Sequence, residues 1–196
     1  MTRASIARPS DPHMRHWLQA DGSLTSRLRV YGTVEVRVQQ QGGRALWAEE
    51  RADLQVSGGY VREVVLLLNG RPAAWARSAT TQAAIQGPWS ALRGLGTRPL
   101  AELLFAGRHV ERAPLQAQHL ARCGLQANHI QRQWQALVEH SPQAALPQSG
   151  LCAAAPPSLL YAAAPRWARS SVFWRHGHPL RVMEAFSPWV AALKPV

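Results

Sequence analysis

The sequence has few of the features that mark secreted, membrane-embedded or metal-binding proteins. Its two cysteines, Cys123 and Cys152, are widely separated, and neither neighbours a histidine at the spacing of a zinc site. No segment approaches the roughly 18 apolar residues of a membrane-spanning helix. The first 30 residues carry several charges in place of the apolar stretch of a secretory leader. These absences predict a cytoplasmic protein with reduced cysteines, no membrane span and no metal site.

Lysine is nearly absent as well. Lys194 is the only lysine among 22 Lys and Arg residues, and only 11 acidic residues oppose them, so the formal net charge is +11. Such a charge is typical of nucleic-acid-binding proteins. The arginines, however, are spread from Arg3 to Arg181 without a dense basic run, and no base-reading motif accompanies them. Codon bias in a GC-rich genome accounts for the excess, so we expect nonspecific affinity at most and no specific nucleic-acid partner.

Apolar residues are plentiful. They make up 46% of the 196 residues and include eight tryptophans, enough for one domain with a substantial core. Residues 14–29 have the pattern of two helices separated by a turn at Asp21-Gly22, with Ser23 as the N-cap of the second. The alternating valines of VEVRV predict a strand, and a further short strand is expected within residues 108–116.

The composition changes in the second half of the chain. Residues 117–140 show the apolar spacing of a helix. From Ser141 to Pro165 the chain is rich in alanine and proline, which is typical of a flexible inserted loop.

Asn69-Gly70 between two apolar runs predicts a β-hairpin, because both residues of a two-residue turn need positive φ. Uninterrupted pairing from this turn places Arg62 opposite Arg77, on the same face of the sheet. Like charges directly opposite one another are destabilising, so this face favours an anion between them. Two alternatives stay open: both side chains extend into solvent, or a bulge shifts the register.

A second hairpin is predicted near the C-terminus, with His176-Gly177 as its two-residue turn. Its register places Arg169 opposite Glu184, a cross-strand pair of opposite charge that stabilises the hairpin. As a surface pair it would contribute less than about 1 kcal/mol. Strands outnumber helices and hairpins dominate, so the fold class is α+β, with an antiparallel β-sheet flanked by helices.

Five blocks of the sequence, taken together, resemble the chorismate pyruvate-lyase (chorismate lyase) family. In the family's order and with its hairpin spacings, they are GSLTSRLR (22–29), REVVLLLNGRPAAWAR (62–77), LGTRPLAELLF (95–105), WARSSVFW (167–174) and PLRVMEAF (179–186). The blocks cover most of the chain. The resemblance implies an antiparallel sheet flanked by helices, with the ligand site buried under helical flaps, in agreement with the fold class predicted above.

The resemblance also implies site residues, position by position. Arg62 matches the family arginine that holds the ring carboxylate of the ligand, and Glu184 matches the glutamate that meets its 4-hydroxyl. Two backbone amides that contact the carboxylate match Leu24 and Leu100. Arg77 matches a second arginine of the family's hairpin.

The implied activity is the conversion of chorismate to 4-hydroxybenzoate and pyruvate, the first step of ubiquinone biosynthesis, without any cofactor. Chorismate carries two carboxylates, and a planar guanidinium binds a carboxylate in bidentate fashion. We therefore expect Arg62 to bind the ring carboxylate and Arg77 the enolpyruvyl carboxylate. Glu184 is the acid/base candidate at C4 and its hydroxyl, and the sequence leaves its protonation state open.

The chain departs from the family pattern in two places. Many members have a second arginine where this chain has Ser170, and the segment at about 117–165 is longer than in compact members. We therefore predict a single domain over residues 1–196 with an Ala/Pro-rich insertion at about 117–165. The resemblance implies a monomer. The alternative function is a noncatalytic domain that senses a small aromatic acid, because fold does not fix function.

Overall fold

A single antiparallel sheet organises the computed structural model, which describes residues 9–105, 109–121, 124–139 and 163–193. The described part contains a seven-stranded sheet in the order β1-β2-β3-β7-β6-β4, with β5 paired to β6 outside this path. The strands are β1 (Val34–Ala45), β2 (Gly58–Leu68), β3 (Arg71–Thr80), β4 (Val110–Arg112), β5 (Gln116–His119), β6 (Trp167–Arg175) and β7 (His178–Phe186). The predicted α+β class is therefore confirmed.

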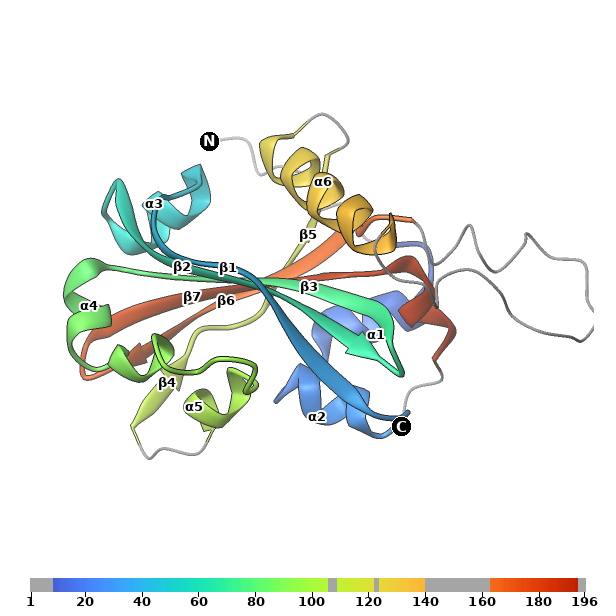
Figure 1. Cartoon of the computed structure of the whole chain (residues 1–196), viewed down its shortest axis with the longest axis horizontal. Coiled ribbons are helices and arrows are strands. Elements are labelled where there is room, and N and C mark those ends of the chain that lie inside the picture. The colour runs from blue at the N-terminus through green and yellow to red at the C-terminus, as the bar shows by residue number, and fades with distance from the viewer. Residues whose placement is uncertain (1–8, 106–108, 122–123, 140–162, 194–196) are drawn as a thin grey trace, which may run out of the picture.

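Helices pack on both faces of this sheet. Figure 1 shows α3 and α6 on one side and α1, α2 and α5 on the other. The helical elements are α1 (Pro12–Gln19), α2 (Leu24–Arg29), α3 (Ala48–Leu54), α4 (Gln82–Gln86), α5 (Ala101–Phe105), α6 (Leu125–Glu139) and the 3₁₀ helices η1 (Ser90–Leu92) and η3 (Pro188–Ala192). None of the helices in the described segments is long and apolar enough to cross a membrane.

The N-terminal helices form as predicted. Asp11 caps α1 by accepting from the backbone N–H groups of its first turn. Ser23 caps α2, and its hydroxyl accepts from the N–H of Ser26 at 3.1 Å. Gly22 lies between the two helices with φ of +80°, a conformation that glycine adopts without strain. The turn and the second cap thus fix where the chain enters α2.

The β2–β3 hairpin has the predicted turn, with φ of 50° at Asn69 and 77° at Gly70. Its register then shifts, because a β-bulge leaves Ala73 without a partner on β2. Pro72, which has no backbone N–H, directly precedes the unpaired Ala73, but Pro179 at the same position of the β6–β7 hairpin causes no shift. The carbonyl of Ala73 instead accepts from the N–H of Ser187 at 2.9 Å.

The bulge overturns the predicted pairing of the two hairpin arginines. Arg62 pairs with Ser78, and Arg77 pairs with Glu63. Because side chains alternate between faces along a strand, a shift of one residue sends the two arginines to opposite faces of the sheet. The prediction that they face one another is therefore wrong, and the alternative of a bulge is correct.

The β6–β7 hairpin has the predicted register. His176 and Gly177 form its two-residue turn, and Arg169 lies opposite Glu184. No interruption follows the turn, so the pairing read outward from it holds along both strands.

The segment preceding the Ala/Pro-rich stretch is an integral part of the fold. Within it, β5 extends the sheet and α6 packs Ile130 and Trp134 against the face opposite α2. Residues 140–162, which hold most of the predicted insertion, lie outside the described residues, as do Cys123 and Cys152. The single domain over residues 1–196 with an insertion at about 117–165 thus stays a prediction.

Candidate active site

A cavity lies between the sheet and the helices α2 and α5. Its floor comes from β1, β2, β3, β6 and β7, and its cover from the first residues of α2 and from the segment that leads into α5. Much of the lining is apolar and includes Leu24, Val64, Leu66, Leu100, Leu104 and Phe173. Such a lining suits a small ring-shaped ligand.

Four of the five predicted site residues line this cavity. Arg62 projects from β2 and Glu184 from β7, while Leu24 begins α2 and Leu100 directly precedes α5. The first N–H groups of a helix have no acceptor within it, so those at Leu24 and Leu100 are suited to bind a ligand. Arg77 does not line the cavity.

Arg62 is a buried cation without a counter-ion. Its side chain is 1% exposed, and no carboxylate pairs with it in the described segments. Its Nη2 donates to the carbonyls of Gly96 at 2.7 Å and Arg98 at 3.3 Å, whereas its Nε is buried without an acceptor. Burial lowers the pKa of Arg62 below its ordinary value. A ligand carboxylate would supply both the missing acceptor and the missing charge.

Glu184 is positioned by Arg169, as the predicted register requires. Nε of Arg169 donates to Oε2 of Glu184 at 2.6 Å. The same guanidinium donates through Nη1 to the carbonyls of Trp17 and Ala20, so it is committed to α1 as well. Arg169 is 1% exposed and Glu184 20% exposed, so this is not an ordinary surface pair. The second oxygen of Glu184 has no partner in the described part of the chain and is available to a ligand.

A third cavity arginine, Arg112, was missed by sequence reasoning. It ends β4 opposite Phe173, and its Cζ lies 5.2 Å from the centre of the Phe173 ring. Its Nε is buried without an acceptor, and the nearest carboxylate, Asp21, is 4.0 Å away and 94% exposed. Burial is the main cause that lowers the pKa of Arg112, and the positive charge of the neighbouring Arg169 lowers it further. The sequence predicted a strand here, but no signal revealed which strand it would join.

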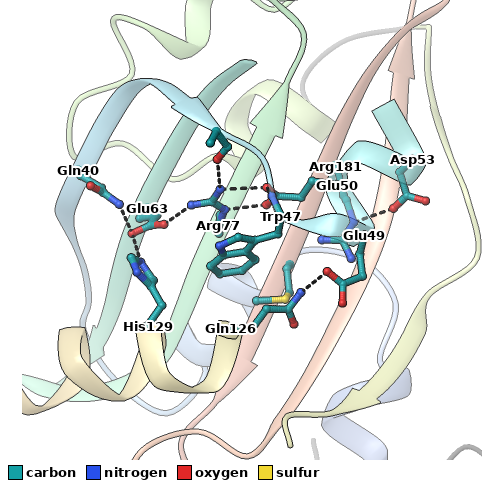
Figure 2. Close-up of polar contacts among 12 residues, drawn as sticks. Gln40, Trp47, Glu49, Glu50, Asp53, Glu63, Arg77, Gln126, His129 and Arg181 are labelled. Atoms are coloured by element: carbon teal, nitrogen blue, oxygen red, sulfur yellow. Dashed lines mark hydrogen bonds and ion pairs between the residues drawn. The ribbon is translucent and has the colours of Figure 1, made fainter. Parts of the chain in front are cut away.

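Arg77 lies on the other face of the sheet, where carboxylates surround it (Figure 2). Its Nε and Nη2 bind the two oxygens of Glu50 at 2.6 and 2.9 Å, and its Nη1 donates to Glu63. The ring of Trp47 stacks on the guanidinium at 4.1 Å. His129 of α6 contacts the second oxygen of Glu63 at 2.9 Å.

These contacts correct the expected role of Arg77. Hydrogen bonds with Glu50 and Glu63 raise its pKa although burial alone would lower it, so the guanidinium is fully paired within the protein. The sheet separates it from the cavity. Arg77 therefore joins α3 to the sheet, and its position gives no support to the expected contact with the enolpyruvyl carboxylate.

The charges of the cavity define the kind of ligand that it can hold. Three guanidinium groups, of Arg62, Arg112 and Arg169, face one carboxylate, of Glu184, among the described residues that line it. These side chains give the cavity an excess of positive charge, and buried charges need partners. Among the described residues, no cluster of three His, Cys, Asp or Glu side chains could hold a metal ion. Fold and site together define a protein with a largely apolar cavity in which arginines outnumber carboxylates among the described lining residues.

The comparison with known families agrees with this description. A family model described as "Chorismate lyase" matches residues 4–191. The chain belongs to the chorismate lyase family, whose enzymes are carbon–oxygen lyases.

Curated relatives cover nearly the whole chain. A protein of Bordetella avium (strain 197N) named "Probable chorismate pyruvate-lyase" is 36% identical over 93% of this chain and 82% of its own length. One of Azoarcus sp. (strain BH72) with the same name is 35% identical over 96% of this chain and 92% of its own. Another, "Probable chorismate pyruvate-lyase 1" of Pseudomonas fluorescens (strain Pf0-1), is 36% identical over 88% of this chain and 81% of its own.

Solved structures resemble this chain only weakly. The effector domain of PhnF from Mycobacterium smegmatis has a TM-score of 0.46 at 9% identity, covering 85% of this chain and 89% of that one. The C-terminal domain of the histidine utilization repressor from Pseudomonas syringae pv. tomato has a TM-score of 0.46 at 12% identity, covering 84% and 98%. Likeness at this level supports no conclusion about the present chain.

Proposed function

We propose that this protein eliminates pyruvate from chorismate to give 4-hydroxybenzoate, without a cofactor, as the first step of ubiquinone biosynthesis. The observation that carries the proposal is the cavity in which Arg62 and Arg112, each with a buried Nε that lacks an acceptor, accompany the Glu184–Arg169 pair. Membership of the chorismate lyase family supports the same substrate. The family resemblance further implies a monomer, and the cysteine usage of the sequence leads us to propose that it acts in the cytoplasm.

The proposed binding mode uses both ends of the cavity. Arg62 and the amides of Leu24 and Leu100 bind the ring carboxylate. The ring lies among the apolar side chains between sheet and helices. At the far end, the free oxygen of Glu184 meets C4 and its hydroxyl group, while Arg169 holds the other oxygen in place.

The elimination needs proton transfer and charge stabilisation at that far end. Glu184 removes the hydrogen from C4, and the electron pair of the C4–H bond forms the C3–C4 double bond. The C3–O bond breaks, the oxygen leaves with its electron pair as the enolate of pyruvate, and a proton added at carbon completes pyruvate. Aromatisation supplies the driving force. The protein contributes by fixing the conformation of the substrate and by stabilising the developing oxyanion.

The test is direct. Purified protein is incubated with chorismate and EDTA, and 4-hydroxybenzoate and pyruvate are measured over time. We expect equal amounts of the two products at a rate well above the uncatalysed background. A rate equal to the background would overturn the proposal, and tight binding of 4-hydroxybenzoate without turnover would instead support the noncatalytic sensing domain.

A further inference from the structure

We propose that Arg112 binds the enolpyruvyl carboxylate of the substrate, the role that we expected of Arg77 before the structure was known. This inference rests on the proposed function, since it assigns the second carboxylate of chorismate within the same cavity. It makes Arg112 a residue that recognises the substrate but not the aromatic product.

A comparison of the hydrogen-bond donors of the three cavity arginines supports this assignment. Arg169 donates through Nε to Glu184 and through Nη1 to Trp17 and Ala20, so most of its donors are already used within the protein. Arg62 and Arg112 each keep a buried Nε without an acceptor. These two guanidinium groups, each with a donor still to be satisfied, suit a ligand with two carboxylates, and each can bind one.

The position of Arg112 decides which carboxylate it binds. Its Nη1 is 4.0 Å from Oδ1 of Asp21, and the carbonyl of the preceding residue, Ala20, accepts from Arg169. Because Arg169 also holds Glu184, Arg112 belongs to the Glu184 end of the cavity. In the proposed binding mode this end receives C4 of the ring, and Arg62 receives the carboxylate on C1 opposite. The enolpyruvyl ether is attached to C3, next to C4. Its carboxylate therefore emerges beside Arg112.

The surroundings of Arg112 fit this role. Asp21, its one ion-pair partner in the described part of the chain, is 94% exposed and 4.0 Å away, too weakly held to compete with an enclosed carboxylate. The ring of Phe173 supports the guanidinium from the cavity wall at 5.2 Å. In this position the guanidinium also faces the negative charge that develops as the C3–O bond breaks and the enolate departs.

The test compares substrate with product. Arg112→Ala should lower kcat/KM for chorismate on the order of 100-fold, because a charge-assisted hydrogen-bond pair is lost. The Kd of 4-hydroxybenzoate, which lacks the second carboxylate, should change by less than about threefold, since the ring carboxylate stays with Arg62. Arg112→Lys keeps the charge and should recover part of kcat/KM. Arg37→Ala, an exposed strand arginine outside the cavity, is the matched control and should change neither quantity.

The outcomes separate this inference from the proposed function. If the wild-type protein does not turn over chorismate, both fall. If it does, and Arg112→Ala either leaves kcat/KM unchanged or weakens 4-hydroxybenzoate binding as much as it lowers kcat/KM, only the role of Arg112 is overturned. Thermal melting of each variant identifies any that fails to fold. Arg112→Gln, which removes the charge but fills most of the space, then replaces Arg112→Ala in the comparison.

Discussion

Arg62 and Arg77 are buried to nearly the same extent but differ in what surrounds them. Arg77 lies between Glu50 and Glu63, whereas Arg62 contacts backbone carbonyls and has no carboxylate partner in the described segments. Removing a charge from water without a partner costs several kcal/mol. The buried charge of Arg62 therefore lowers the stability of the folded protein, and a bound anion would offset this loss.

The first prediction concerns this residue. Arg62→Ala should weaken 4-hydroxybenzoate binding by a factor on the order of 100, because hydrogen bonds to charged groups contribute about 1.5–3 kcal/mol each. The measurement is isothermal titration of the product into the purified variant. Arg71→Ala, an exposed arginine on β3 beside the turn, should bind the product like the wild type. Equal losses in the two variants would contradict the placement of Arg62 in the cavity.

At the scale of elements, the two hairpin turns could be predicted from the sequence, whereas the β-bulge after the first turn could not. Asn69-Gly70 and His176-Gly177 both make the expected turns, because their φ requirements are properties of the residues themselves. A proline follows at the same position after both turns, Pro72 in the first hairpin and Pro179 in the second, yet only the first hairpin has a bulge. The sequence around the turns therefore did not indicate the bulge, which decides on which face of the sheet Arg77 lies.

The site residues divide in the same way: those within sequence motifs could be predicted, and one whose position depends on a distant strand could not. The contacts carried over by resemblance, Arg62, Glu184, Leu24 and Leu100, all lie on the cavity, although their roles stay a proposal. Arg112 was not found, because its place depends on pairing with a strand some 60 residues later in the sequence. The helix α3 was also missed, since the stretch around Trp47 has no clear apolar period.

The second prediction concerns the start of α2. Ser23→Ala removes the cap and should lower the free energy of unfolding by about 1 kcal/mol, as measured by urea denaturation. Because the same turn positions the amide of Leu24, the Kd of 4-hydroxybenzoate should rise a few-fold. Ser26→Ala, an exposed position inside the helix, should leave both nearly unchanged. A loss of stability without any change in Kd would show that Leu24 does not contact the ligand through its amide.

At the scale of the whole molecule, the network around Arg77 joins the layers on the face opposite the cavity. Glu50 comes from α3, Glu63 and Arg77 from the sheet, and His129 from α6 (Figure 2). Burial alone would raise the pKa of Glu63, but hydrogen bonds from His129 and Arg77 lower it below its ordinary value of 4.5. Folding therefore favours the ionised form of Glu63.

The third prediction follows from the sign of this shift. A carboxyl group with a depressed pKa stabilises the fold fully above its unfolded value and loses this effect as the pH falls through its folded value. Stability of the wild-type protein should therefore decline as the pH falls below 4.5. Glu63→Gln should be less stable at pH 7 by about 3 kcal/mol, yet lose less on acidification. Denaturation from pH 7 to pH 3 measures both, with exposed Glu35→Gln as the control. Parallel pH profiles for Glu63→Gln and the wild type would contradict the prediction.

The position of β7 has a consequence for how the protein is made. This strand lies between β3 and β6, although it follows both of them in the sequence. A nascent chain that has reached only residue 177 leaves two strand edges open, and such edges invite pairing with other chains. Glu184 also lies on this strand. Synthesis of the last few residues of β7 therefore both completes the sheet and adds the acid/base candidate to the cavity.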